Sequence, residues 1–265
     1  LRKGDITSDE TGATVQYVDD SIATAVDTAT DTTVPLNIIN DLSQTYTFKT
    51  VALMKASLIV FPAGKKILWQ GYYTESDGGG NWGIVTAGAH TEDGGEFFTL
   101  ANGDYIQANI RGRISIRKYG ATGDDVTDDH AAIQTCITNN RDIYAPDGFY
   151  RVTKAIQVLT DKTLTGTTKA FFLRSDTTPE TIDSDIVTAV FYLTGSNIRL
   201  EGFQIFGVLR GVDIDGIALR RPDNSSIRDV HINSCSRGIY SISSPWMFEF
   251  TRIRQAGMQT AAEIG

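Results

Sequence analysis

The sequence contains little cysteine, histidine and proline, and it has no long apolar run. Its 265 residues include two cysteines, three histidines and six prolines. Cys136 and Cys235 lie far apart and belong to no repeated framework of the kind that disulfide-rich domains show, so buried free thiols are expected. No segment reaches the roughly 18 consecutive apolar residues of a membrane-spanning helix, so membrane insertion is not expected.

A net positive charge is also missing. The formal net charge is -8 at pH 7 and the isoelectric point is about 4.9, so the surface as a whole does not suit a nucleic acid. An acidic polysaccharide would have to be met by local basic residues. His90, His130 and His231 are isolated and lack the spacing of zinc ligands. The sequence therefore predicts no metal site and no cofactor.

The stretch 114–152 marks a change of pattern. Its first residues alternate apolar and polar, which predicts a short strand. The aspartates that follow suit a turn and a helix N-cap; they are Asp124, Asp125, Asp128 and Asp129. An amphipathic helix ending at Asn139-Asn140 is predicted next, because four apolar residues share one face: Ala132, Ile133, Cys136 and Ile137. Strands are predicted over 141–145 and 149–152, joined by a Pro-Asp-Gly turn.

The order of these elements resembles a known family. A strand, the pattern Y-G-A-x-G-D-x-x-x-D-D, a one-faced helix and P-x-G-x-Y are similar to the entry segment of the pectate-lyase-like right-handed parallel β-helices, bacteriophage tailspike proteins in particular. The matching residues are Tyr119, Gly120, Ala121, Gly123, Asp124, Asp128, Asp129, Ala132, Ile133, Gln134, Pro146, Gly148 and Tyr150. The resemblance implies that the helix covers the first coil, where a solenoid would otherwise expose its core and unpaired strand edges.

Short strand patterns repeat beyond Val152. Two segments share one spacing of apolar residues: Leu200, Phe203 and Ile205 in the first, and Ile227, Val230 and Ile232 in the second. The offset between them is 27 residues, and 23 more lead from Ile227 to Phe250. Residues 215–219 and 237–241 form a second matching pair, offset by 22. These offsets predict single coils of a solenoid with loops of variable length.

A helical pattern lies near the N-terminus. From Thr14 to Ala29 the apolar residues are three and four apart, the spacing of a coiled-coil seam; they are Val15, Val18, Ile22, Ala25 and Ala29. Because so short a helix is marginal in water, the pattern fits either a seam shared by several copies or one amphipathic helix packed on its own domain. Residues 27–35, rich in Thr and Asp, are predicted to be a linker.

Residues 36–113 are predicted to form a small β-rich domain. A short helix is expected over Thr50–Ser57, and strands are expected over Lys65–Tyr73, Gly83–Thr86 and Phe97–Leu100. The glycine-rich stretch 76–83 is not a phosphate loop, because no Lys-Ser or Lys-Thr pair follows it and no helix pattern opens after it. The sequence FKTVALMKAS, followed by W-x-G-Y-Y-x-x-x-D-G-G-G-N-W, resembles the module that precedes the β-helix in tailspikes and tail fibres, which implies a structural neck.

Few acidic residues are candidates for catalysis. Asp213 and Asp215 would share one face of a strand with Cα atoms about 6.6 Å apart at a rise of ~3.3 Å per residue. This spacing suits the carboxyl pair of a glycosidase, but a solvated strand face explains it equally and is favoured. Glu201, Asp229 and Glu249 are single acids to which the pattern assigns no partner. The sequence therefore leaves the catalytic residues unknown.

Two other groups of residues invite a binding role. The aspartates of 124–129 lack the ligand spacing, central Gly and terminal Glu of an EF-hand loop, so helix capping is favoured over calcium binding. Tyr240 and Trp246 could stack on sugar rings, but core or interface packing is favoured for each.

The resemblance implies a mainly β chain in three parts: a short N-terminal helix and linker (1–35), a virion-side neck or anchoring domain (36–113), and the cap helix and first coils of a right-handed parallel β-helix, truncated (114–265). Tailspikes of this family are homotrimers on the phage virion that bind and usually cleave host surface polysaccharide. The implied location is therefore the phage tail, acting at the host bacterial surface. The implied partners are the tail, its baseplate or another tailspike through the N-terminal region, and host capsular polysaccharide or lipopolysaccharide.

The same resemblance implies that the complete protein is a polysaccharide depolymerase, a glycoside hydrolase in preference to a lyase. In that family the catalytic carboxyls lie further along the β-helix. This chain, which opens at Leu1 and stops at Gly265 within a coil, is therefore expected to be a piece that attaches and orients the enzyme. Two alternatives stay open: a non-catalytic tail adhesin or branching anchor, and a secreted cellular β-helix enzyme that degrades polysaccharide.

Overall fold

The computed structural model describes residues 16–17, 41–207, 214–257 and 260–263. The chain divides into two compact units, one of residues 1–111 with 118–120 and one of residues 112–117 with 121–265. Both units are built mainly from strands, and the second is a parallel β-helix. The predicted fold class, mainly β with a capped parallel β-helix, is therefore confirmed.

The helix predicted over Thr14–Ala29 lies outside the described residues, apart from two positions. Gln16–Tyr17 form strand β1, which pairs in parallel with Tyr46 and Thr47. At these two positions a strand stands where a helix was predicted. The linker predicted over 27–35 also lies outside the described residues.

The first unit is a six-stranded sheet with strand order β1-β2-β3-β4-β6-β5. Its longer strands are β2 (Tyr46–Thr50), β3 (Lys66–Gly71), β4 (Asn81–Thr86), β5 (Phe97–Thr99) and β6 (Tyr105–Ala108). Strands β2 and β3 are parallel, whereas β3, β4, β6 and β5 pair antiparallel. The buried core of this sheet includes Phe48, Trp69, Phe98 and Ile106.

The connection between the parallel strands β2 and β3 contains the short helix α3, Val51–Ala56, which confirms the helix predicted over Thr50–Ser57. Thr50 begins the helix, because its Oγ1 accepts a hydrogen bond from the N–H of Leu53 at 3.2 Å. Ser57 ends it. Val51 and Met54 bury their side chains in the core, which fixes the helix on the sheet.

The glycine-rich loop after β3 is organised by one carboxylate, that of Asp77. Its two oxygens accept hydrogen bonds from four backbone N–H groups at 2.8–3.0 Å, those of Tyr72, Tyr73, Thr74 and Gly79. Burial alone raises the pKa of Asp77, but the four N–H donors outweigh it and lower the pKa below its ordinary value of 3.8. The loop is therefore held by an ionised side chain.

We expect the loop to loosen in acid. Because the pKa of Asp77 is lower in the folded protein than in the unfolded chain, its contribution to stability is present above pH 3.8 and is lost as the pH falls through the folded pKa. In an NMR titration, the Tyr73 and Thr74 amide shifts should move in that range, and Asp77→Asn should abolish the movement. The exposed neighbour offers a control: Glu75→Gln should leave the titration unchanged, and an unchanged titration in Asp77→Asn would contradict this assignment.

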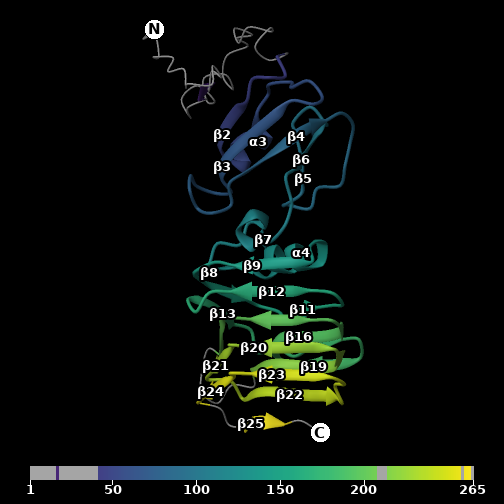
Figure 1. The fold of residues 1–265 in the computed structure, drawn as a ribbon. Coiled ribbons are helices and arrows are strands. Elements are labelled where there is room, and N and C mark those ends of the chain that lie inside the picture. The colour runs from purple at the N-terminus through teal and green to yellow at the C-terminus, as the bar shows by residue number, and fades with distance from the viewer. Residues whose placement is uncertain (1–15, 18–40, 208–213, 258–259, 264–265) are drawn as a thin grey trace. The chain divides into compact units, whose positions relative to one another are not determined.

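The second unit winds through three parallel sheets, and its coils stack from β9 down to β25 (Figure 1). The first sheet contains β7 (Ile114–Ser115), β9 (Asp142–Ala145), β12 (Thr163–Gly166), β17 (Arg199–Glu201), β20 (Ser225–Arg228) and β23 (Phe248–Thr251). The second contains β8 (Asp124–Asp128), β10 (Gly148–Val152), β13 (Ala170–Arg174), β18 (Gln204–Gly207), β21 (His231–Asn233) and β24 (Arg254–Ala256). The third contains β11 (Ile156–Val158), β16 (Ala189–Ser196), β19 (Asp215–Asp223), β22 (Arg237–Ser243) and β25 (Thr260–Glu263).

The register of the coils is the one that the repeats predict. Leu200 pairs with Ile227, and Ile227 pairs with Phe250. In the third sheet Ile217 pairs with Ile239. The predicted offsets of 27, 23 and 22 residues are therefore confirmed as single turns of the helix.

Inward-facing side chains form one buried ladder along each sheet. The ladders are Ile143, Leu164, Leu200 and Ile227 in the first sheet, Tyr150, Phe172, Ile205 and Ile232 in the second, and Ile156, Phe191, Ile217 and Ile239 in the third. Both cysteines are buried thiols outside any disulfide, as predicted, and burial raises the pKa of Cys235 to about 12. One coil alone buries too little apolar surface to be stable, so each coil is stabilised by stacking on its neighbours.

Each of the three sheets is covered at its first coil by a different part of residues 114–139. Strand β7 pairs with β9 in the first sheet, and β8 pairs with β10 in the second. Helix α4 (His130–Asn139) packs beside β11 in the third sheet and buries Ile133, Cys136 and Ile137. The predicted cap helix and its apolar face are confirmed, whereas the predicted strand at 114–117 is shorter and continues as a 3-10 helix over Ile116–Tyr119.

Gln134 of α4 completes the open edge of the third sheet. Its side-chain Oε1 accepts from the backbone N–H of Gln157 at 2.8 Å, and its Nε2 donates to the carbonyl of the same residue at 3.1 Å. The amide thus replaces a neighbouring strand at one position of β11, which is an edge strand. An unpaired edge is a site of unwanted strand pairing, so this cap protects the fold.

The aspartates of 124–129 adopt a different arrangement from the predicted turn. Residues 124–128 form strand β8, in which the Asp124 carboxylate accepts from Val126 and Thr127 N–H groups at 2.9 and 2.8 Å. Asp129 occupies the N-cap position of α4, but its side chain makes no cap hydrogen bond and instead accepts from the N–H groups of Thr122 and Gly123. The carboxylates of Asp124 and Asp129 therefore stabilise the backbone of the cap through hydrogen bonds from its N–H groups.

Candidate functional site

The carboxylate of Asp215, one of the two candidate acids, is committed to structure. Asp215 is 2% exposed, and its two oxygens accept from Arg237 Nε at 2.9 Å and from a terminal guanidinium nitrogen at 2.8 Å. Thr188 Oγ1 donates to it at 2.6 Å. These bonds join β19 to β22 and to the residue before β16. The other candidate, Asp213, lies outside the described residues.

Asp215→Asn should therefore destabilise the fold. The substitution removes the buried carboxylate of a bidentate ion pair. We expect the free energy of unfolding to fall by about 2–3 kcal/mol. This is less than the loss for a fully buried pair, because the Arg237 side chain is 35% exposed. A urea titration measures this loss. Asp142→Asn, an exposed acid on β9, is the control and should have little effect. Unchanged stability together with lost polysaccharide cleavage would instead make Asp215 a catalytic group.

The other acids that the sequence singled out lie on successive coils of the first sheet: Glu201 on β17, Asp229 directly after β20 and Glu249 on β23. Asp229 forms an ion pair with Arg252, and Glu249 lies 3.4 Å from Arg228 and accepts from Thr251 Oγ1 at 2.6 Å. The hydrogen bonds from Arg252 and from Thr251 lower the pKa of Asp229 and of Glu249 respectively. Hydrolysis of a glycosidic bond requires an acid that is still protonated at the working pH, so neither residue suits that role.

Burial raises the pKa of Asp129 above its ordinary value of 3.8, yet the position of Asp129 in the cap excludes it as a general acid. Both carboxylate oxygens of Asp129 accept hydrogen bonds from backbone N–H groups, and the residue is 1% exposed. Among the described residues, no group of three or more His, Cys, Asp or Glu is arranged to hold a metal ion. His130 and His231 stand apart, His130 with its Nε2 3.2 Å from the carbonyl of Ala155.

A hairpin that the sequence did not predict shapes the outer face of the third sheet. Strands β14 (Glu180–Ile182) and β15 (Asp185–Val187) are inserted between β13 and β16 and pair antiparallel. The hairpin shares an apolar cluster with the outward-facing side chains of the sheet; its members are Ala155, Ile182, Val187, Ala189, Tyr192, Ala218 and Tyr240. This second core fixes the hairpin against the sheet.

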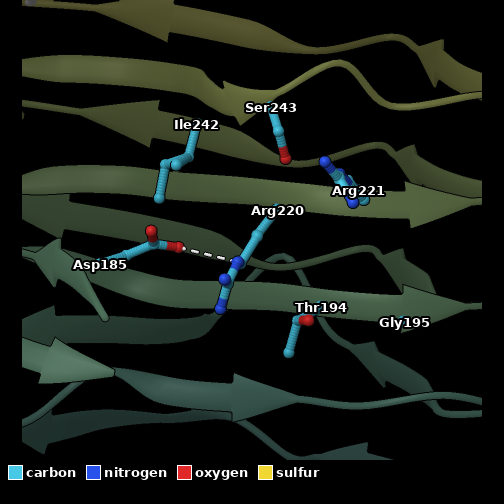
Figure 2. Close-up of a pocket in the computed structure, with 7 residues that line it drawn as sticks. All are labelled: Asp185, Thr194, Gly195, Arg220, Arg221, Ile242 and Ser243. Atoms are coloured by element: carbon cyan, nitrogen blue, oxygen red, sulfur yellow. Dashed lines mark ion pairs between the residues drawn. The ribbon is translucent and has the colours of Figure 1, made fainter. Parts of the chain in front are cut away.

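Beside the hairpin lies an open groove of about 440 Å³ on β16, β19 and β22 (Figure 2). We call it the hairpin groove; its lining residues are Asp185, Thr194, Gly195, Arg220, Arg221, Ile242 and Ser243. Six of the seven are polar or glycine, so the groove suits a hydroxylated or charged ligand in preference to an apolar one.

Asp185 fixes one wall of the hairpin groove. Its Oδ2 lies 3.1 Å from Arg220 Nε and accepts from the hydroxyl of Tyr192 at 2.9 Å. Burial raises the pKa of Tyr192 to about 12, and the bond to Asp185 adds to that rise, so the phenol stays protonated. Because Asp185 is already engaged twice and no second carboxylate among the described residues lines the groove, this arrangement can bind a ligand but offers no described acid–base pair to cleave one.

Sequence reasoning missed the groove residues, although the sequence holds one signal for them. The offset between successive coils is 21 residues from Ile143 to Leu164, but 36 from Leu164 to Leu200. A coil that is longer than its neighbours marks an insertion, and insertions of solenoids lie on one face. Of the two aromatics considered, Tyr240 is buried in the cluster beneath the hairpin, whereas Trp246 is 72% exposed and so lies outside the core.

Comparisons with known proteins agree with this architecture. Residues 113–199 match the family described as rhamnogalacturonase A/epimerase, pectate lyase-like. The chain is 31% identical over 128 residues to the pre-neck appendage protein of Bacillus phage B103; the match covers 45% of this chain and 15% of that protein. The chain thus spans about 15% of the length of this curated relative.

Two solved structures share the fold over most of the chain. The gp42 tailspike of Acinetobacter phage vb_AbaP_AS12 gives a TM-score of 0.65 at 18% identity, covering 79% of this chain and 39% of that one. The enzymatically active domain of tailspike protein 2 of bacteriophage CBA120 gives 0.60 at 15% identity, covering 89% and 43%. At such identities the likeness establishes the fold and leaves the chemistry to be argued from the residues.

Proposed function

We propose that this chain, a phage tailspike-like β-helix protein of the virion tail, belongs to a tailspike that recognises and degrades host surface polysaccharide, either capsule or O-antigen. The observation that supports this proposal is the capped parallel β-helix, whose entry segment, 113–199, matches a pectate-lyase-like family. The complete protein would be a depolymerase, a glycoside hydrolase in preference to a lyase.

Within that protein the described part would anchor and bind. The first unit would attach to the phage tail, its baseplate or another tailspike, and a homotrimer would form the complete spike. The first sheet of the β-helix carries paired charges, such as Arg228 and Glu249, that could contact a hydroxylated polymer. Because arginines engage Asp229 and Glu249, and Asp185 is the described carboxylate that lines the hairpin groove, we place the catalytic residues elsewhere in the complete protein.

A non-catalytic tail adhesin is the second candidate function. The observation that favours it is that several carboxylates of the β-helix are engaged by arginine, as in Asp229 with Arg252, or by backbone N–H groups, as in Asp124 with Val126. An adhesin needs a binding surface and no acid–base pair.

Incubating the complete protein with purified host capsule separates these functions. A hydrolase releases new reducing ends, a lyase also produces unsaturated uronates that absorb in the ultraviolet, and an adhesin binds without releasing either. We expect new reducing ends without ultraviolet absorbance. The proposal would be refuted if the protein neither bound nor cleaved capsule or O-antigen. Mass measurement in solution tests the homotrimer, which a monomer at micromolar concentration would contradict.

A further inference from the structure

Arg221 projects from an irregular point in β19. The register between β16 and β19 shifts between Thr194 and Ser196, and the register between β19 and β22 shifts after Leu219. Arg221 has a φ of 49°, which is uncommon for a residue with a side chain, and Pro222, which follows it, is buried. Such bulges redirect a side chain and are frequent beside functional sites.

The side chain of Arg221 is exposed, and in the part of the chain that the structure describes its guanidinium has no ion-pair or hydrogen-bond partner. Arg220, one residue before it, is held by Asp185. Figure 2 shows the two arginines on the wall of the hairpin groove, with the ion pair at Arg220 alone. Arg221 is thus the cation that the groove leaves for a ligand.

The hairpin groove also contains a hydroxyl that lacks a partner. Ser243 Oγ is buried and makes no hydrogen bond among the described residues. Ser243 pairs in register with Arg220 on the neighbouring strand, so its hydroxyl lies on the same wall as the arginines. A buried polar atom without a partner is costly, and a ligand that bonds to it removes that cost.

We propose that the hairpin groove binds a uronate carboxylate of an acidic polysaccharide, with Arg221 forming a charge-assisted pair and Ser243 Oγ donating a further hydrogen bond. Planar guanidinium groups match carboxylates in geometry, and a groove that is polar and open at the surface accepts one sugar of a longer chain. The net charge of -8 does not oppose this, because the charges beside the groove balance. Arg220 pairs with Asp185 and lies 3.5 Å from Asp183, and Arg221 supplies a second cation. This inference rests on the proposed function and specifies its ligand class.

The test uses the complete protein with two matched probes: an oligomer of glucuronic acid, and the same oligomer with its carboxyls reduced to alcohols. Calorimetric titration at low salt should show binding of the acidic probe, and Arg221→Gln should weaken it about tenfold, the low end for a charge-assisted bond because the site is exposed. Ser243→Ala should weaken it less. Arg254→Gln, which removes an exposed arginine from the second sheet, is the control and should bind as the parent does.

Comparing the parent and Arg221→Gln with both probes isolates the contact between Arg221 and the carboxylate. Arg221→Gln should leave affinity for the reduced probe unchanged, because that probe has no carboxylate for the arginine to meet. Equal binding of both probes, an equal effect of Arg221→Gln on both, or no binding of either would overturn the inference. If the protein still degrades host capsule in any of these cases, the proposed function stands; if it neither binds nor degrades capsule, both fail.

Discussion

Arg174→Met is expected to lower the free energy of unfolding of the β-helix unit by about 3–5 kcal/mol, the loss that follows when one partner of a buried charged network is removed. Arg174 is the last residue of β13 and faces inward with 0% exposure. Its guanidinium donates to the carbonyls of Asp176, Thr178 and Ala189 at 2.8–3.0 Å and lies 2.8 Å from a Glu180 carboxylate oxygen.

The methionine fills a similar volume, so the loss reports the hydrogen bonds in preference to a cavity. Three carbonyls and the Glu180 carboxylate would be left without this donor, and the hairpin of β14 and β15 would lose its anchor. A urea titration measures the stability, and hydrogen exchange of the hairpin amides locates the effect. Lys169→Met, at an exposed lysine just before β13, is the matched control. A hairpin that stays protected in Arg174→Met would contradict the anchoring role.

Phe172→Ala should destabilise the β-helix unit by a similar amount, about 3–5 kcal/mol, because it opens a cavity in the aromatic part of the core. The Phe172 ring is fully buried and meets the rings of Phe191 and Phe203 edge to face, both with centroids 5.1 Å apart. Phe172 also stacks in register between Tyr150 and Ile205, so the cavity would weaken three successive coils.

The neighbouring residue provides the control. Phe171 points to the outer face of the same strand, where it stacks on Phe149 with ring centroids 4.5 Å apart. Phe171→Ala removes the same atoms from a partly exposed position and should cost about 1–1.5 kcal/mol. Thermal unfolding followed by circular dichroism compares the two variants. Equal losses for Phe171→Ala and Phe172→Ala would contradict the assignment of inner and outer faces.

Features that depend on local sequence could be predicted before the structure was known. The cap helix with Ile133, Cys136 and Ile137 on one face follows from residue spacing, and the coil register follows from the repeat that links Leu200 to Ile227. The recognition of a tailspike-like β-helix from the motif at Tyr119–Tyr150 is confirmed by the family match and the phage relatives, as is a location in the virion tail.

Features that depend on contacts across coils could not be predicted. An inward-facing arginine such as Arg174 breaks the alternation of apolar and polar residues that predicts a strand. The cost of burying its charge is offset by hydrogen bonds to carbonyls of an inserted loop. The turn of that hairpin is formed by Asp183 and Ser184, both with positive φ, instead of the Asn-Gly pair that marks such turns. The pairing of Asp215 with Arg237 also joins residues 22 positions apart, on two neighbouring coils.

The hairpin groove joins these unpredicted features in one place. Arg174 anchors the hairpin, the hairpin carries Asp185, and Asp185 holds Arg220 beside Arg221. Loss of the Arg174 anchor should therefore also weaken ligand binding, although Arg174 does not line the groove.

The central claim is that this β-helix recognises the polysaccharide coat of a host bacterium. Binding of the labelled complete protein to host cells, compared with isogenic cells that lack capsule and O-antigen, tests it most directly. We expect saturable binding to coated cells, competed by the purified polysaccharide, and no binding to bare cells. Equal binding to both kinds of cell would contradict it.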